Sequence, residues 1–273
     1  MRLLPAIVSL CRDVPLKSLE LHSRRAAGYE AGYEAISAAQ LGPLAALQRL
    51  PSLALLGVDS LGQSLAGTLR QLTALTCLRL ATEHEDGPVH WEVFDAAAAL
   101  TQLEELYITG GSRTKVQRLP DGMSRLQRLR TLQVHGIRML ASRVLNTLTS
   151  LQRLEMLLPG DQLPMHDPRL QNPLPPGMHA LRSLRDLRVT CCWQPMPALA
   201  LPQLTELLLD APAFGGTVSP VLSRRPACCP LVILLLTTTA PPAPLSCSTP
   251  LQQLQILHTW GSGPARSLCA LRL

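Results

Sequence analysis

The most constraining feature of the sequence is a motif that occurs twice. Residues 119–134, LPDGMSRLQRLRTLQV, return as residues 174–189, LPPGMHALRSLRDLRV, with nine of sixteen positions identical. In the first copy apolar residues follow at steps of three (Met123, Leu126, Leu129, Leu132), and a step of two ends the motif at Val134. Residues three apart on an α-helix are offset by about 60° per step, so these leucines cannot keep one helical stripe and a coiled coil is excluded. The final step of two has the period of a strand, and the motif predicts a repeat unit that closes with a short strand.

The same spacing recurs along most of the chain. The Leu-x-Leu strand signature, or its variant with Ile, Met or Val, begins at Leu19, Leu53, Leu78, Leu106, Leu132, Leu154, Leu187, Leu207, Leu234, Leu254 and Leu271. Most of these starts are roughly 20 to 34 residues apart, as in arrays whose units stack on one another. Leucine makes up roughly a fifth of the residues and aromatic residues only 3%, which suits a narrow core lined repeatedly by one side chain.

This unit, Leu-Pro-x-x-apolar-x-x-Leu-x-x-Leu-x-x-Leu-x-Leu, is similar to the leucine-rich repeats of intracellular proteins, including plant-type, Shoc2-like and disease-resistance-like arrays. The resemblance implies an α/β solenoid, a right-handed β-α superhelix with short parallel strands on the concave face and helices or irregular turns on the convex face. The family usually has Asn, Cys or Thr three residues after the Leu-x-Leu, and only Cys192, Thr239 and Thr259 fit. The other positions carry Val58, Glu83, Gly111, Ile137, Pro159 and Pro212, so we expect irregular convex loops.

The expected organisation is a leader or cap over residues 1–15 and a leucine-rich-repeat domain over residues 16–273. The domain should contain about ten units, interrupted by an alanine-rich helix or loop at 23–40 and a proline-rich insertion at 159–176. The pattern loosens after residue 211. The last match, at Leu268, Leu271 and Leu273, reaches the chain end without a polar cap, which suggests truncation at the C-terminus.

Cysteine spacing and hydropathy indicate the compartment. The eight cysteines show no Cys-x-x-Cys spacing, so we expect reduced thiols. The short apolar leader lacks a signal-peptide cleavage site, and the longest apolar run, 231–236, is too short to span a bilayer. These features predict a cytoplasmic protein without a transmembrane segment. Family members also occur in the ciliary axoneme, which gives an alternative location in the cytoskeleton.

Four sequence features are candidates for a chemical site. Neither Lys17 nor Lys115 follows a phosphate-binding glycine motif, so no nucleotide is expected. Residues 62–67 (GQSLAG) resemble a nucleophile elbow around Ser64, but the closing glycine is one position late and no strand was expected before it. The loop 83–90 holds acids and histidines in no defined metal-ligand spacing, and Cys191, Cys192 and Trp193 read as packing residues. We therefore predict a non-enzymatic protein with no catalytic residue, cofactor or metal.

The remaining candidate is the outward face of the strands. The protein-binding residues predicted there are Glu105, Tyr107, Gln133, His135, Arg153, Glu155, Asp186 and Arg188, and the outward set also includes Ala54, Cys77, Arg79 and Glu206. Both charge signs are interspersed despite a net charge of +6, which favours a protein partner and makes nucleic acid unlikely. We expect Arg125, Arg128 and Arg182 to lie on the edge or the convex side instead.

The predicted function is a non-enzymatic leucine-rich-repeat scaffold that binds a protein partner through its concave strand face. Three alternatives stay open at this point. The chain could be the recognition fragment of an immune-receptor or ubiquitin-ligase-like protein whose effector domain lies outside it. It could bind RNA or an anionic surface through its arginines, or its strand face could be solvated and have no partner.

Overall fold

The computed structural model describes residues 8–9, 16–22, 36–82, 88–110, 119–135, 143–157, 177–190, 201–210, 232–237, 254–260 and 267–272, with backbone only for 157, 190, 207–210 and the strands from 232 onward. The chain divides into two compact units, which are Met1–Met139 (unit 1) and Leu140–Leu273 (unit 2).

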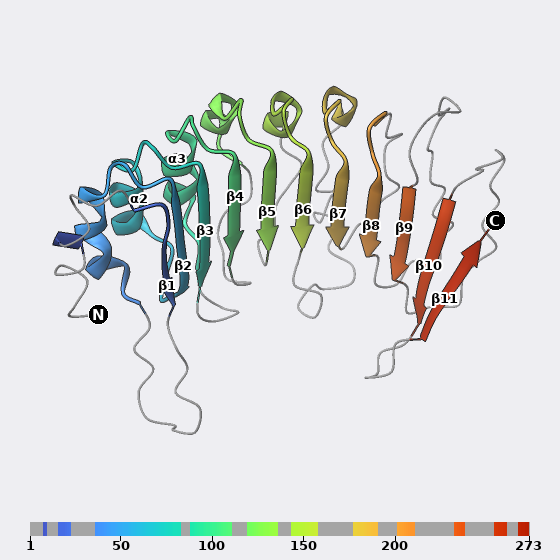
Figure 1. Cartoon of the computed structure of the whole chain (residues 1–273), viewed down its shortest axis with the longest axis horizontal. Helices are drawn as coiled ribbons and strands as arrows, with labels where there is room; N and C mark the ends of the chain where they lie inside the picture. Colours follow the sequence, from blue (N-terminus) through green and yellow to red (C-terminus); the bar gives the residue numbers. More distant parts are fainter. Residues whose placement is uncertain are drawn as a thin grey trace, which may run out of the picture. The chain divides into compact units, whose positions relative to one another are not determined.

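Unit 1 is built on short parallel strands that follow one another in chain order (Figure 1). These strands are β1 (Leu19–His22), β2 (Ser52–Val58), β3 (Cys77–Thr82), β4 (Glu105–Thr109) and β5 (Thr131–His135). The pairing aligns the repeat positions, since Leu53 lies beside Leu78, Leu78 beside Leu106, and Leu106 beside Leu132. The register predicted from the Leu-x-Leu spacing is therefore confirmed in this unit.

Helical segments precede the later strands of unit 1. They are η1 (Ala38–Ala46), α2 (Gln63–Leu69), α3 (Trp91–Ala98) and η2 (Asp121–Arg125), of which η1 and η2 are 3₁₀ helices. The sequence interpretation missed both α-helices. It passed over residues 91–99 as a link, although Val93, Phe94 and Ala97 form a buried face there. It also expected no strand before Gly62, which is wrong, because β2 ends at Val58 and a short link leads into α2.

Unit 2 repeats the arrangement and ends differently. Its parallel strands are β6 (Arg153–Leu157), β7 (Asp186–Thr190), β8 (Glu206–Asp210), β9 (Val232–Thr237) and β10 (Leu254–Trp260), with 3₁₀ helices η3 (Arg143–Thr147) and η4 (Met178–Ala180) before β6 and β7. The strand β11 (Ser267–Arg272) runs antiparallel to β10.

Two predictions about the end of the chain are wrong. A repeat strand must run parallel to its neighbour, so the antiparallel β11 is a hairpin partner of β10 and not a further unit at Leu268 and Leu271. In β10 it is Ile256, not Leu254, that pairs with Leu234 of β9. The shift is two residues, and the strand therefore presents the same face as expected.

The three-residue period has a physical cause that the sequence interpretation missed. The amide of Leu126 donates to the carbonyl of Met123 at 3.0 Å, and the amide of Leu129 donates to that of Leu126 at 3.1 Å. Such bonds to the third residue back belong to 3₁₀ geometry, in which side chains three apart eclipse one another. The apolar residues at these steps of the motif therefore face the core, and they are at most 2% exposed in both copies: Met123, Leu126, Leu129, Leu132, Val134, Met178, Leu181, Leu184, Leu187 and Val189.

A backbone ladder joins successive repeats where each strand begins. In unit 1 the carbonyl of Glu104 accepts the amides of Arg130 and Thr131 at 2.8 and 3.0 Å. In unit 2 the carbonyl of Gln152 accepts the amides of Arg185 and Asp186 at 2.8 and 3.0 Å. This ladder needs no particular side chain, so it forms although most repeats lack the Asn, Cys or Thr of the family pattern. Parallel strands, buried leucines and these turns together make the fold an α/β leucine-rich-repeat solenoid.

Several predicted features lie outside the described residues. They are most of the leader 1–15, the alanine-rich stretch up to residue 35, the insertion 159–176, and the cysteine pairs near 191 and 228. Of the positions three residues after Leu-x-Leu, Val58 and Thr259 are described, within β2 and β10, and Val58 is buried.

Candidate functional site on the strand face

Alternation along each strand places the predicted binding residues opposite the core. Leu106 and Ile108 of β4 are buried, while Glu105 and Tyr107, which directly precede them, are partly exposed. The strand register then sets the neighbours of Tyr107, which are Arg79 of β3 on one side and Gln133 of β5 on the other. The outward face expected for these strands is therefore confirmed for Glu105, Tyr107, Gln133 and His135, which all keep partial solvent exposure.

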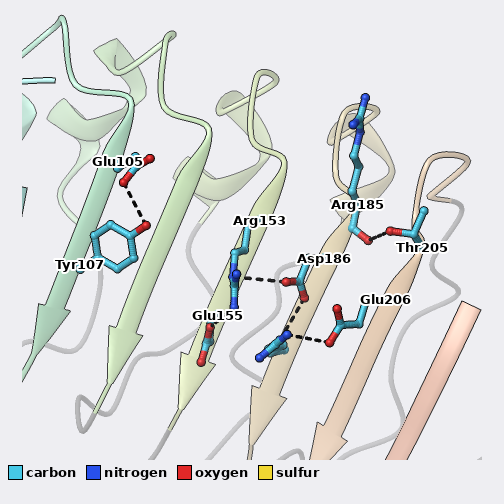
Figure 2. A network of polar contacts seen from close by, with 9 residues as sticks. Glu105, Tyr107, Arg153, Glu155, Arg185, Asp186, Thr205 and Glu206 are labelled. Carbon is cyan, nitrogen blue, oxygen red and sulfur yellow. Dashed lines mark hydrogen bonds and ion pairs between the residues drawn. The ribbon is translucent and has the colours of Figure 1, made fainter. Parts of the chain in front are cut away.

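In unit 1 a cluster of side chains converges on one carboxylate oxygen, Oε2 of Glu105. The Tyr107 hydroxyl donates to it at 3.0 Å, as Figure 2 shows, and the Cys77 thiol donates to it at 3.5 Å. The guanidinium of Arg79 lies 3.8 Å from the same oxygen and stacks on the Tyr107 ring, with Cζ 4.6 Å from the ring centroid. We call Cys77, Arg79, Glu105 and Tyr107 the Glu105 cluster.

Burial and the shared carboxylate act in the same direction on two groups of this cluster. Burial raises the pKa of the Cys77 thiol, and the negative charge of Glu105 raises it further. The pKa of the Tyr107 hydroxyl is raised by burial first and by Glu105 second. Both groups are therefore protonated at neutral pH and act as hydrogen-bond donors. The cluster has one carboxylate, one guanidinium and no activated nucleophile.

Unit 2 carries a chain of alternating charges on its strand face, the unit 2 ion-pair chain. Arg153 contacts Glu155 at 3.2 Å and Asp186 at 3.2 Å. Arg188 contacts Asp186 at 3.2 Å and Glu206 of β8 at 2.7 Å. Figure 2 shows the Arg153, Asp186 and Glu206 contacts running across three neighbouring strands, β6, β7 and β8. The structure therefore brings together all four residues predicted in this unit and adds Glu206.

Two residues of this face are less accessible than predicted. Glu155 is 7% exposed as a residue, and Ala54 in unit 1 is also 7% exposed. Arg153 donates a hydrogen bond to Glu155, and Arg79 is the cross-strand neighbour of Ala54. Both residues face outward in register and are nevertheless buried.

Burial is also the largest influence on the pKa of Asp186, the carboxylate between the two arginines. It raises the pKa of Asp186 above its ordinary value, and although Arg188 and Arg153 lower the pKa while Glu206 raises it, the net shift is upward. Two arginines therefore do not fully compensate the loss of solvent at this carboxylate. The ion-pair chain is better understood as mutual compensation of buried charge than as a source of large stabilisation.

Sequence reasoning missed Arg79, Cys77 and Glu206 as members of these clusters. All three were assigned to the outward face, but each strand was read by itself. The signal was available in the alignment of repeats, because equal positions in successive Leu-x-Leu signatures are cross-strand neighbours. Arg79 and Tyr107 occupy the same position, as do Cys77 and Glu105, and Glu206 occupies the same position as Asp186.

The other sequence candidates are not assembled into sites within the described residues. Ser64 is exposed in the first turn of α2, where its carbonyl accepts a bond from the Thr68 hydroxyl at 3.4 Å. Residues 83–87 and Cys191 to Trp193 lie outside the description. Among the side chains that are described, no three His, Cys, Asp or Glu residues are grouped so that they could hold a metal ion. None of the described helices is both long and apolar enough to cross a membrane.

Comparison with known proteins gives a structural similarity and no match in sequence. No protein-family model matches the chain, and no curated protein matches it in sequence. Among solved structures it is similar to the leucine-rich-repeat ectodomain of the Arabidopsis receptor kinase HAESA, solved in complex with an N-terminally extended IDA peptide hormone. The similarity covers 84% of this chain and 41% of that chain, at 13% sequence identity and a TM-score of 0.36. The chain thus spans less than half of that ectodomain, and its own strand pairing and buried leucines carry the fold assignment.

Proposed function

We propose that the chain is a non-enzymatic scaffold that binds a protein partner through its concave strand face. The observation that carries the proposal is the Arg79–Tyr107 pair in the Glu105 cluster. Arg and Tyr are enriched among the residues that dominate binding energy at protein interfaces. Here Glu105 and the ring stacking hold both side chains in place, so little conformational entropy remains to be lost on binding.

The strand face of unit 2 supports a protein partner in a different way. Its two arginines already contact carboxylates within the chain, so its charges are matched locally and leave little excess of either sign. A phosphate backbone requires a continuous run of uncompensated cations. Interspersed charge of both signs instead suits the polar part of a protein interface, where it selects partners more than it adds affinity.

A pair of matched variants tests the proposal. Arg79→Ala with Tyr107→Ala removes the stacked pair, and Arg125→Ala with Arg128→Ala removes two exposed arginines before β5 as a control. Proteins captured from cell extract on the wild-type chain are quantified by mass spectrometry against both variants. We expect the first variant to reduce capture of a specific partner by roughly tenfold or more, and the control to change it little.

The opposite outcome would reject the proposal. If the control abolishes capture and the Arg79/Tyr107 variant keeps it, the chain binds by its basic outer surface. Steep loss of capture between low and physiological salt, with nucleic acid in the eluate, would favour the RNA-binding alternative. Circular dichroism of both variants shows whether the fold persists, since all four substituted side chains are at least partly exposed.

We also propose a cytoplasmic location, with the ciliary axoneme as the alternative. Irregular cysteine spacing supports it, and Cys77, the cysteine whose side chain is described, is a free thiol. A reducing agent should then leave the melting temperature nearly unchanged, because no disulfide worth about 2–4 kcal/mol is expected. A large drop in the melting temperature on reduction would indicate an oxidising compartment.

A further inference from the structure

Three basic residues lie on the turn that leads into β7. His179, Arg182 and Arg185 follow one another at steps of three, each directly after a buried apolar residue (Met178, Leu181, Leu184). Because side chains three apart eclipse in these turns, the three residues are displayed on one side, all three are exposed, and the two arginines are cations. Figure 2 shows the Arg185 side chain extending away from the ion pairs of the strand face. We call these residues the turn row.

The turn row has no carboxylate to pair with in the described part of unit 2. The carboxylates whose side chains are described there are Glu155, Asp186 and Glu206, and all three belong to the unit 2 ion-pair chain. The Arg182 and Arg185 side chains make no ion pair or hydrogen bond with any described residue. Among the described residues of this unit, the carboxylates therefore lie on the strand face, and Arg182 and Arg185 lie on the turn without an ionic partner.

The corresponding position in unit 1 carries a compensated arginine. Arg130 precedes β5 as Arg185 precedes β7, and both amides bind the carbonyl of the residue before the preceding strand. In unit 1 that residue is Glu104, whose carboxylate lies 3.8 Å from the Arg130 guanidinium. In unit 2 it is Gln152, which is neutral. Among the described residues, the arginine at this position therefore has an ionic partner in unit 1 and none in unit 2.

The backbone around Arg185 is fixed, which suits a binding position. Its amide donates to the Gln152 carbonyl at 2.8 Å, and its carbonyl accepts the Thr205 amide at 2.8 Å and the Thr205 hydroxyl at 3.0 Å. Guanidinium groups on a rigid backbone lose less freedom when they bind planar oxyanions in bidentate geometry. We propose that the turn row binds an acidic peptide segment of a partner protein, a site separate from the strand face.

Residue types on the same turns favour this partner over other anionic ones. The side chains described in unit 2 include no aromatic residue, whereas proteins that bind single-stranded nucleic acid stack bases on aromatic rings. No exposed apolar residue accompanies the cations to enter a lipid surface. Cations three residues apart in a 3₁₀ turn are separated by roughly 6 Å, close to the roughly 6.7 Å between alternate residues of an extended strand. A peptide with acidic residues at alternate positions therefore matches the row.

The test is a titration of the full chain with a fluorescent peptide in which Glu alternates with Ser, followed by anisotropy at physiological salt. The wild type should bind it, and should not bind the same peptide with Gln in place of Glu. Arg182→Gln with Arg185→Gln should weaken binding roughly tenfold, as expected for losing charge-assisted bonds. Gln152→Glu should weaken it by roughly threefold, because it gives Arg185 the carboxylate that Arg130 has in unit 1.

Two controls match these variants in net charge. Arg125→Gln with Arg128→Gln removes two exposed arginines from unit 1, and Arg125→Gln alone removes one. Both should leave the affinity within about twofold of wild type, because neither variant changes the turn row and the charges removed are exposed and screened by salt. Gln152→Glu leaves both arginines in place, so it tests the proposal even if the double variant folds poorly.

Three outcomes would overturn the proposal. The first is no binding of the Glu peptide to the wild type. The second is equal weakening in the unit 1 control, which would make net charge the cause. The third is tighter binding, through the same arginines, to an oligouridine or to phosphatidylserine vesicles than to the peptide. None of these outcomes depends on the partner of the strand face, so this site and the proposed function can fail separately.

Discussion

The strand faces of the two units differ in how their partly buried charges are compensated. In unit 1 three donors share one oxygen of Glu105, and the carboxylate keeps 41% of its side-chain exposure. In unit 2 each arginine contacts two carboxylates, and Asp186 keeps only 16%. Open parallel sheets of this kind leave one face uncovered, and charged residues there must either remain in water or compensate one another.

Because of this difference, we expect the unit 1 strand face to bind a partner and the unit 2 strand face mainly to compensate its own charges. The Glu105 cluster contains an aromatic ring and an exposed guanidinium, so it has free surface to offer to a partner. In the unit 2 ion-pair chain both arginines already contact carboxylates of the same chain, and a partner would have to displace those contacts. Uncompensated charge in unit 2 lies on the turn row instead. We therefore expect substitutions on the strand face to affect binding mainly in unit 1 and stability mainly in unit 2.

The largest loss of stability is expected for a substitution on the buried side of β5. Leu132 is 1% exposed, and Leu132→Asp would bury a charge without a partner, which should cost on the order of 4 kcal/mol and unfold unit 1. The adjacent Gln133→Asp places the same charge on the outward side and should cost less than about 0.5 kcal/mol. Urea unfolding followed by circular dichroism measures both. Equal losses would show that the two sides of β5 are not distinct.

The second effect compares the two arginines directly. Arg188→Met should cost about 2 kcal/mol at neutral pH, because it leaves Asp186 and Glu206 close together with one cation fewer. Arg79→Met in unit 1 should cost less than about 1 kcal/mol, since Glu105 is more exposed and keeps two hydrogen-bond donors. Similar losses in the two variants would remove the distinction between the faces.

The sign of the pH dependence gives a check on the same variant. The folded-state pKa of Asp186 is already raised, so its favourable contribution is present below the unfolded value of 3.8 and is lost as pH rises through the folded pKa. Removing Arg188 should raise the folded pKa further. The stability deficit of Arg188→Met should therefore shrink as pH falls from neutral toward 4. A deficit that grows on acidification would contradict this assignment.

The sequence predicted the strands well and the turns poorly, for a physical reason. Strand register follows from a period of two that any buried face enforces, so Leu53, Leu78, Leu106 and Leu132 could be aligned by spacing alone. The period of three was correctly separated from an α-helix, but its 3₁₀ origin was not seen. Helix α3 was missed because its alanines give a weak apolar signal, although all three of them are buried.

The sequence predicted which strand positions form the candidate site but not the contacts between their side chains. Spacing determined which residues face outward, yet contacts such as the shared oxygen of Glu105 depend on side-chain conformations that no periodicity encodes. Glu155 shows the limit most clearly, because it faces outward and is still buried under its neighbour Arg153. At the chain end a hairpin pairing replaced the expected repeat, since Leu-x-x-Leu-x-Leu spacing does not distinguish parallel from antiparallel partners.

The third effect distinguishes the two copies of the motif that defines the chain. Gly177 has φ of +101°, and an added Cβ would lie 2.7 Å from Nδ2 of Asn146. Gly122, its counterpart in the first copy, does not have a positive φ, and its Cβ would meet Ala98 at 3.3 Å. Gly177→Ala should therefore cost about 1–2 kcal/mol in thermal unfolding, and Gly122→Ala roughly 0.5 kcal/mol. The reverse order would show that the backbones of the two copies are not as described.

The smallest effect concerns the thiol on the unit 1 face and reports on the Glu105 cluster itself. Because burial and the Glu105 carboxylate raise the pKa of Cys77 above 9.0, its thiolate fraction at pH 8 is lower than that of an ordinary cysteine. Glu105→Gln removes the negative charge and should lower this pKa, so alkylation of Cys77 at pH 8 should become several-fold faster.

Peptide mapping after timed iodoacetamide treatment isolates this cysteine from the other seven. As a control, Glu104→Gln removes a neighbouring carboxylate that contacts Arg130 and should leave the rate unchanged. An unchanged rate in Glu105→Gln would mean that the carboxylate does not accept the thiol proton, and the cluster would then reduce to the Arg79, Glu105 and Tyr107 contacts.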